Sequence, residues 1–486
     1  MKKGLWISIG VLVLVAASYP AAAWYSGIVV QSRLKEYREL MLKQAPYVTV
    51  AQERYERGIY RSHQEITYEV GKQLLGELAK AAAPAGTAGK LPESLRFTVR
   101  SEVEHGPFPK MGPLALARIE TEFVMSDAVR KELAKAFGAG KPIEIVTFLS
   151  YGGGGSTTIS SPSFAGLKVE DATMSWRGFK ATVDFGPKLA TFEMKGTAPG
   201  FEVTSEKSGT ARMDDVSFES KSALAFDDLY IGDASVTMKA LNVQPSANAS
   251  ADAKPAPAMA MSGLGYTVRM ARKDDFLDLS GKFLVGNMDV SVVKLSDLHY
   301  EFSLNHLHGP SVAAFVRLAR KSFAENRATL ASELPAEGRR IGIEILKRDP
   351  ELVIDQISFT MPEGDAKLTG RMHIVGFEPS DIDGPSGPVV LLRKIDAEVD
   401  FSIAEALLAK FAASAGGSSG GATAEQNLAA MEAQGYVTRK DGRLSTHIEY
   451  KGGQLTVNGK PFVPPTPNAT PMPPGTGKPA RDTTHT

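Results

Sequence analysis

Apolar and polar side chains alternate along much of the chain, and this two-residue period constrains the fold more than any other feature. Successive side chains of an extended strand point to opposite faces, so alternation is typical of a strand with one buried and one exposed face. The clearest sets, one in each half of the chain, are Tyr60, Ser62, Gln64, Ile66, Tyr68 and Val70, and Leu444, Thr446, Ile448 and Tyr450. The pattern predicts half-buried antiparallel strands.

Turn signals separate these strands. Residues 451–454 read Lys-Gly-Gly-Gln, and Asn458-Gly459 supplies residues that tolerate the positive φ angles of a tight turn. The C-terminal part is therefore predicted to be a β-meander. Residues 357–361 and 368–374 flank Pro-Glu-Gly-Asp and predict a further hairpin.

Helices are predicted at only a few places in the body. Ser126 can cap a helix that Gly138 stops, and Pro310 can open a second one. Ser402 and Glu405 have the spacing of a capping box for a third helix over residues 403–413. The predicted fold class is α+β and β-rich, a large antiparallel-sheet body with a few packed helices.

A stretch without charge precedes this body. Residues 4–30 contain no charged side chain and follow Lys2 and Lys3. At about 1.5 Å per residue, a helix of this length crosses a hydrocarbon core of roughly 30 Å with tilt. Trp24 and Tyr25 suit the outer membrane–water interface, which favours a retained transmembrane anchor.

A cleaved leader, or an uncleaved signal, is the alternative. The run over residues 5–17 has the length of a secretory h-region, and Pro20 followed by three alanines resembles a cleavage site. Either way the N-terminal lysines predict export of the body across the cytoplasmic membrane. The absence of cysteine fits the periplasm of a bacterium, an oxidising space. The expected location is the inner membrane, single-pass, with the C-terminal body in the periplasm.

Composition narrows the partners. Lys plus Arg and Asp plus Glu are 55 each, and no long basic run occurs, so we expect no nucleic-acid partner. We expect the inner membrane to be contacted through residues 4–30. A lipid, an envelope protein or a second copy of the chain are the further partners considered.

Two segments resemble each other. The first, RFTVRSEVEHGP, ends at Pro107 and the second, HYEFSLNHLHGP, ends at Pro310; each precedes a predicted helix and then a strand. This suggests a duplicated β-rich unit. The predicted organisation is an anchor over 1–31, units over 32–243 and 263–462 joined by an Ala/Pro-rich linker over 244–262, and a disordered Pro-rich tail over 463–486.

No complete catalytic motif is present. Nucleophile-elbow, P-loop and H-E-x-x-H patterns are missing, so we assign no catalytic residue and expect no cofactor. His306 and His308 lie two apart on a predicted strand and His105 stands at the matching place of the first half, which makes these three the weak candidates for metal ligands. No third ligand has convincing spacing, and we favour a structural role for them and no metal.

Four blocks together resemble the YdgA-like family of bacterial envelope proteins of uncharacterised function. They are YERGIYRSHQE from Tyr55, VEHGPFP from Val103, LHGPS from Leu307 and GYVTRKDGRLSTHIEYKGGQLTVNGKPF from Gly435, behind the lysine-led apolar segment. The resemblance covers nearly the whole chain except the tail. It implies an inner-membrane-anchored periplasmic protein and supplies no catalytic residue.

Three functions follow as hypotheses. The first is a non-enzymatic binding or envelope-assembly protein that handles lipid or another hydrophobic ligand on a sheet face. The second is an envelope hydrolase or metal-dependent enzyme, and we lean against an enzyme. The third is a structural protein that self-associates through exposed strand edges.

Overall fold

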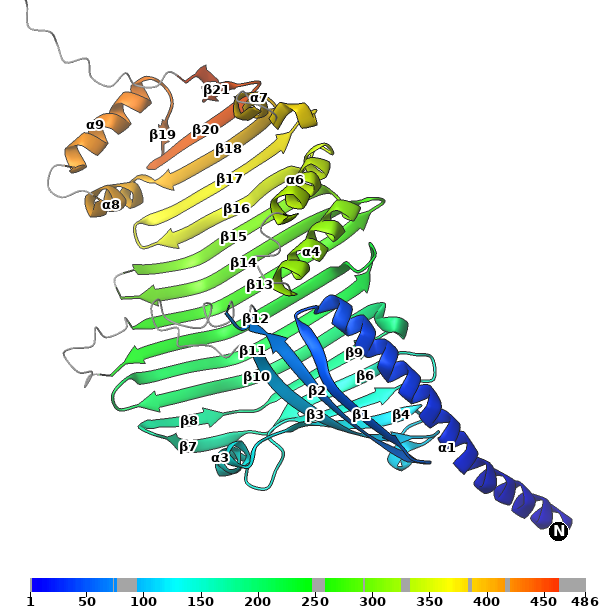
Figure 1. Cartoon of the computed structure of the whole chain (residues 1–486). Coiled ribbons are helices and arrows are strands. Elements are labelled where there is room, and N and C mark those ends of the chain that lie inside the picture. Colours follow the sequence, from blue (N-terminus) through cyan, green and yellow to red (C-terminus); the bar gives the residue numbers. More distant parts are fainter. Residues whose placement is uncertain are drawn as a thin grey trace, which may run out of the picture.

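A computed structural model describes residues 2–72, 74–76, 94–246, 258–291, 293–324, 333–382, 387–415 and 420–462. Within these ranges a single antiparallel sheet contains all 22 strands (Figure 1). The predicted β-rich antiparallel fold is therefore confirmed. The N-terminal end of the sheet curls, so that its first strands cross in front of the middle of the sheet.

The curled end consists of strands that follow each other in space as they do in sequence. They are β1 (Val48–Arg57), β2 (Arg61–Gly71), β3 (Ser94–His105), β4 (Ala117–Val124), β5 (Glu144–Leu149), β6 (Gly155–Ser161), β9 (Phe179–Phe185) and β10 (Thr191–Ser205). The hairpin of β7 (Phe164–Val169) and β8 (Ala172–Trp176) pairs with the remaining length of β10.

The middle of the sheet is a broad meander of long strands. It continues through β11 (Gly209–Leu224), β12 (Tyr230–Pro245), β13 (Met259–Lys273), β14 (Phe276–Val290), β15 (Val293–His308), β16 (Glu351–Met361), β17 (Gly364–Ile374) and β18 (Ile395–Ala404). The C-terminal meander is formed by β19 (Thr438–Lys440), β20 (Arg443–Lys451), β21 (Gln454–Val457) and β22 (Lys460–Pro461). Both hairpins expected from turn residues, over 357–374 and 443–457, are confirmed.

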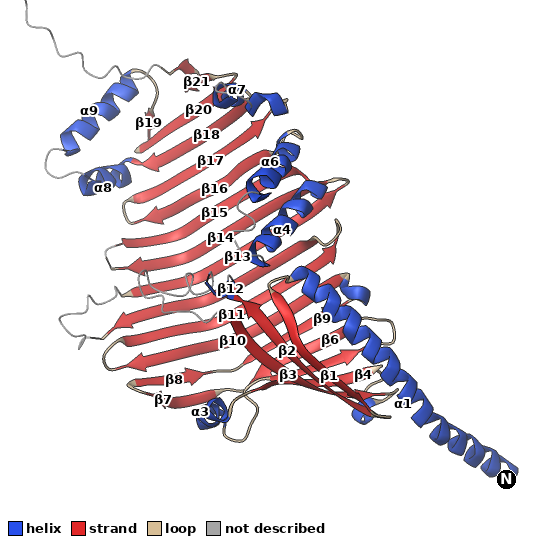
Figure 2. Cartoon of the chain, in the orientation of Figure 1, coloured by secondary structure: helices blue, strands red, loops and turns tan. Residues whose placement is uncertain are grey.

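Few helices accompany this sheet, as predicted (Figure 2). They are α1 (Lys2–Gln44), α3 (Asp127–Phe137), α4 (Gly309–Ala324), α6 (Glu333–Leu346), α7 (Gly387–Arg393), α8 (Glu405–Ala415) and α9 (Gly420–Ala433), with 3-10 turns η1 (Pro109–Met111), η2 (Pro187–Leu189) and η3 (Pro379–Ile382). Ser126 caps α3 by accepting a hydrogen bond from the Val129 amide, and Gly138 ends it at φ 58°.

The predicted capping box at Ser402 is wrong. Ser402 and Ile403 belong to β18, where Ile403 pairs with Ala366 and Leu444 and lies in the apolar core. The helix begins at Glu405 instead. Burial of the isoleucine between two strands outweighs the local helix signal.

Three apolar cores hold helices to the sheet. Val30 and Tyr37 of α1 pack inside the curled end with Val103, Leu116, Ile119 and Leu149. Ala313 of α4 packs on Leu277 of β14, and Leu407 of α8 packs on the β16–β18 region. The strand registers place the cores under α4 and α8 on the same face of the sheet.

The expected membrane anchor, linker and tail are only partly within the described residues. No helix of the described residues is long and apolar enough to span a membrane. The side chains of residues 5–17 lie outside the described part, as do the tail and residues 247–257 of the expected linker. The linker's ends are strand, because β12 runs to Pro245 and β13 starts at Met259.

The suggested duplication is not visible in the elements. The strand expected after the helix of the first half, residues 165–176, aligns with residues 350–361 of the second half. In the first half it forms two strands, β7 with Leu167 and β8 with Met174, joined by a turn at Glu170, which has φ 54°. Their counterparts Leu352 and Phe359 lie on one strand, β16. The two His-Gly-Pro segments both end a strand, β3 at His105 and β15 at His308, but the aligned segments that follow them fold differently.

Candidate functional site

A row of apolar side chains crosses the broad part of the sheet. Residues that pair directly across antiparallel strands point to the same face. The strand registers place one residue from each strand, β11 through β18, side by side: Phe218, Val236, Tyr266, Phe283, Tyr300, Ile357, Leu368 and Phe401. We call these eight residues the apolar row; at about 4.8 Å per strand it is roughly 34 Å long.

The apolar row lies on the face that the helices cover. Phe283 is six residues from Leu277 on β14, so both point to the same side, and Leu277 packs beneath α4. Ile357 is likewise two residues from Phe359, which packs on the core beneath α8. We call this side of the sheet the apolar face. Helices α4 and α6 lie over one flank of the sheet and α8 lies at the other (Figure 2).

The middle of the apolar row is open. Tyr266 is 47% exposed, Tyr300 48% and Val236 43%, whereas the other members of the row are partly buried. Apolar residues in the middle of a wide sheet are usually covered by other elements. Uncovered aromatic side chains at this position are the feature of the described residues that most directly indicates a binding surface.

Glycines on neighbouring strands make room for the aromatic rings. The ring of Phe302 lies directly over Gly281: a β-carbon added to this glycine would be only 2.6 Å from Cε1 of Phe302. Phe218 covers Gly196 in the same manner. Both pairs are direct neighbours across strands of the apolar face. The rings therefore lie against the backbone, and the face stays shallow enough to be approached.

The opposite face of the same strands is polar. Lys282 and Glu301, paired across β14 and β15, form an ion pair of 2.7 Å. Arg371 and Glu398 form another, of 2.8 Å, across β17 and β18. The sheet thus has one charged face that is exposed to water and one apolar face. An apolar ligand can therefore bind only on the apolar face.

A basic pocket adjoins the apolar face. It has a volume of about 740 Å³ and lies between the C-terminal end of α1, the β11–β12 turn and α4. Its floor includes Leu224 and Tyr230, which pair with each other and share the face of Phe218. Its cationic side chains are Lys43, Lys188, Arg317, Arg320 and Lys321.

Two carboxylates offset part of that charge. Asp228 accepts from Arg320 at 3.0 Å, and Asp227 accepts from Arg317 at the same distance. Five cationic and two anionic side chains leave an excess positive charge on the pocket wall. Such a wall beside apolar side chains suits an anionic head group attached to an apolar tail.

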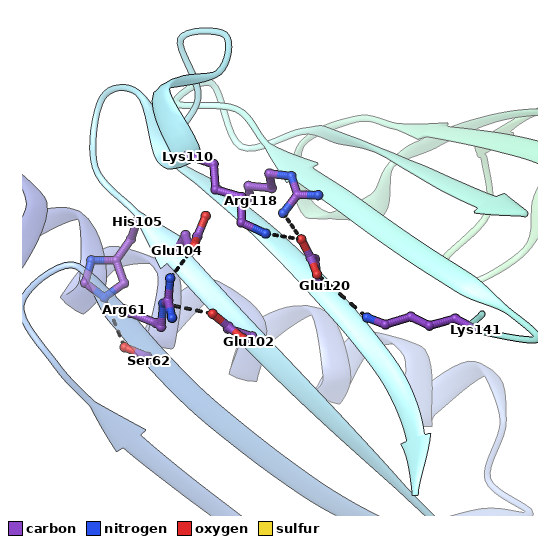
Figure 3. A network of polar contacts seen from close by, with 9 residues as sticks. All are labelled: Arg61, Ser62, Glu102, Glu104, His105, Lys110, Arg118, Glu120 and Lys141. Carbon is purple, nitrogen blue, oxygen red and sulfur yellow. Dashed lines mark hydrogen bonds and ion pairs between the residues drawn. The ribbon is translucent and has the colours of Figure 1, made fainter. Parts of the chain in front are cut away.

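His105 connects α1 to the sheet (Figure 3). The side chain is 2% exposed; Nδ1 lies 2.9 Å from the Ala23 carbonyl and Nε2 lies 3.0 Å from the Ser62 hydroxyl. A carbonyl only accepts, so Nδ1 carries the proton and donates to it. Burial lowers the pKa of His105, which keeps the ring neutral, and the Ser62 hydroxyl then donates to Nε2. The geometry assigns His105 to clamping the helix.

His306 and His308 do not join His105. Both of their rings pack against Phe276, with ring centres 3.9 and 6.3 Å from it, and His308 Nδ1 lies 2.7 Å from the Ser311 hydroxyl at the start of α4. Across the described ranges, no three histidine or carboxylate side chains are grouped so as to hold a metal ion. The contacts of His306 and His308 give both side chains a packing role beside the start of α4.

A charged network lies next to the His105 clamp (Figure 3). Lys110 and Arg118 both donate to the Glu120 carboxylate, and Lys141 lies 3.8 Å from it. These cations lower the pKa of Glu120 to about 2. The network ties the loop between β3 and β4 to strand β4, so this loop is held in one position.

Comparisons with known proteins identify a family and one relative but name no activity. A family model described as "Bacterial protein of unknown function (DUF945)" matches residues 1–465. "Protein YdgA" of Escherichia coli (strain K12) is 22% identical over 508 residues, covering 95% of this chain and 95% of that protein. No solved structure matches.

Proposed function

This chain belongs to the family of bacterial proteins of unknown function that its family model describes, and we propose that it is a membrane-tethered periplasmic protein that binds lipid acyl chains, without catalysis, on the apolar face. The observation that carries the proposal is the open apolar row. Its partly exposed aromatic members lie on the face opposite a charged, water-facing side.

The energetics favour a long apolar ligand. A tyrosine side chain offers about 200 Å² of surface, so Tyr266 and Tyr300, each about half exposed, leave roughly 100 Å² uncovered. At about 25 cal/mol per Å², covering each of these two tyrosine side chains contributes roughly 2.5 kcal/mol. The row, roughly 34 Å long, exceeds the about 15 Å that one leaflet of hydrocarbon spans, so it accommodates a complete acyl chain.

The basic pocket supports a ligand with an anionic head group. Leu224 and Tyr230 continue the apolar face to the wall that carries Arg317 and Arg320. A phospholipid lying on the face would place its tails on the apolar side chains and its phosphate near the cations.

The tether consists of the N-terminal part of α1. Ala23, Ser26 and Val30 are buried against the body, so the length left for lipid is about residues 4–22. Nineteen residues at about 1.5 Å each give roughly 28 Å, close to the thickness of a hydrocarbon core. Lys2 and Lys3 precede this segment and favour a cytoplasmic N-terminus, which directs the body to the periplasm.

Charge placed on the apolar row tests the proposal. The full chain is purified from membranes in mild detergent, and bound phospholipid is quantified by mass spectrometry. We expect the double variant Tyr266→Glu/Tyr300→Glu to lose most of its bound lipid, because two carboxylates would have to be desolvated beneath the acyl chains.

Thr267→Glu is the matched control. Thr267 is the next residue on β13, points to the polar face and pairs with Lys282, so the new carboxylate meets a cation. We expect its lipid content to equal that of the natural chain. If the double variant Tyr266→Glu/Tyr300→Glu retained as much lipid as the natural chain, binding on the apolar face would be contradicted.

A further inference from the structure

Exposed apolar side chains gather where α1 leaves the body. They lie on the β1–β2 turn and on the β3–β4 loop, and their exposed fractions are 53% for Ile59, 48% for Tyr60, 51% for Phe108, 96% for Met111 and 67% for Leu114. We call these five residues the collar. Met111 is the most exposed large apolar residue of the described chain.

The collar borders the helix at a defined height. The Tyr19 ring stacks on the Tyr60 ring at 6.2 Å, and the Tyr19 hydroxyl donates to the Phe108 carbonyl at 3.5 Å. One turn further along α1, Ala23 meets His105. From this level the helix continues away from the body toward its N-terminus (Figure 1).

The loop that carries most of the collar is held firmly. Ala115 and Leu116 are buried, with the Leu116 amide 2.8 Å from the Leu149 carbonyl. The Gly112 amide closes a turn on the Pro109 carbonyl at 3.0 Å, and the Lys110–Glu120 contact fixes the loop to β4. The exposed side chains are therefore presented by a loop that Pro109, Ala115 and Leu116 anchor to the body.

We propose that the collar is a second membrane contact, inserted into the outer boundary of the bilayer that α1 crosses. This rests on the tether of the proposed function. The uncharged residues 4–17 belong to the same helix that the collar borders, so in the proposed topology the next surface beyond the collar is lipid. Aromatic and long aliphatic side chains are the residues that enter this boundary.

The charge at the collar fits the same occupant. Arg57 lies 5.6 Å from the centre of the Trp24 ring, on the body side of the collar. A cation beside a tryptophan is the pairing expected at the level of phosphate head groups. With α1 and the collar both fixed, the body cannot tilt freely, and the curled end of the sheet lies against the membrane surface.

The absence of cysteine allows this contact to be measured on the full chain. Met111→Cys carries an environment-sensitive fluorophore in vesicles of phosphatidylethanolamine and phosphatidylglycerol. Val389→Cys on α7, a residue 55% exposed at the C-terminal end of the sheet, is the control. Neither substitution disturbs a buried contact, so both variants fold.

We expect the label at Met111 to be quenched about threefold more strongly than the label at Val389 by lipids with a shallow spin label, and to be protected from aqueous iodide. Vesicle flotation separates the two proposals. A chain that floats but whose Met111 label is as open to iodide as the Val389 label overturns the collar. A chain that does not float overturns the tether and the collar with it.

Discussion

Gly27 of α1 tests the helix clamp most directly. A β-carbon on Gly27 would lie 2.7 Å from Cε1 and 2.9 Å from Nε2 of His105, closer than such atoms approach in proteins. The ring cannot move away without lengthening its hydrogen bonds to Ala23 and Ser62. Gly27→Ala adds a single methyl group and should therefore break the contact of α1 with His105.

The magnitude follows from three contributions. Alanine in place of glycine stabilises a helix interior by about 1 kcal/mol. Overpacking a close-packed site costs about 1–3 kcal/mol, and weakening one buried hydrogen bond costs about 1 kcal/mol more. We expect Gly27→Ala to lower the opening free energy of α1 by about 1–3 kcal/mol net.

Gly342→Ala is the matched control. Gly342 lies in α6, and a β-carbon there would meet nothing within 4 Å. Only the helix propensity changes, so α6 should become more stable by about 1 kcal/mol. Replacing glycine by alanine should thus destabilise α1 at Gly27 and stabilise α6 at Gly342.

Hydrogen exchange followed by mass spectrometry measures both openings. Peptides over residues 23–44 should exchange at least about fivefold faster in Gly27→Ala, and peptides over α6 about fivefold slower in Gly342→Ala. The double variant Gly27→Ala/His105→Ala should show less than the sum of the two losses, since the ring that clashes is gone. Slower exchange of α1 in Gly27→Ala would refute the clamp.

Two further predictions concern the same region. The pKa of His105 is lowered by burial, so its contribution to stability is complete above the unfolded value of about 6.5 and is lost as pH falls below it. The protection factor of α1, which corrects the exchange rate for the slower intrinsic exchange at lower pH, should therefore fall from pH 7 to 5, and His105→Gln should abolish this dependence. Glu120→Gln removes the carboxylate that Lys110 and Arg118 share. We expect the loop over residues 106–116 to lose about 1 kcal/mol of stability, a value discounted for the partial exposure of these side chains, and to exchange about fivefold faster. Unchanged exchange over these residues would contradict the network.

The fold was largely predictable because alternation and turn residues act locally. The strand around Ile66, the hairpin after Met361 and the meander ending at Asn458-Gly459 lie where the sequence places them. The helix at Ile403 was mispredicted because its strand pairing is a contact with Ala366 and Leu444, which no local pattern contains.

The candidate site was harder to predict because it depends on register. Each member of the apolar row belongs to a different strand, and only the pairing of Tyr266 with Phe283 and of Phe283 with Tyr300 makes a surface of them. Alternation also breaks inside strands: Leu298 and Leu295 are three apart, and Asp297 between them has φ 49°. A sequence search for aromatic residues near the middle of successive long strands would have found part of the row.

The clamp and the collar place a constraint on how a ligand reaches the apolar face. Because α1 is fixed to the body through Ala23 and Val30, the proposed tether would hold the curled end of the sheet near the bilayer. The apolar row starts at Phe218, on a strand directly next to β10 of the curled end. A lipid leaving the membrane would therefore meet the apolar face at its N-terminal strands first. Loosening the clamp should then reduce lipid loading even though Gly27 does not lie on that face.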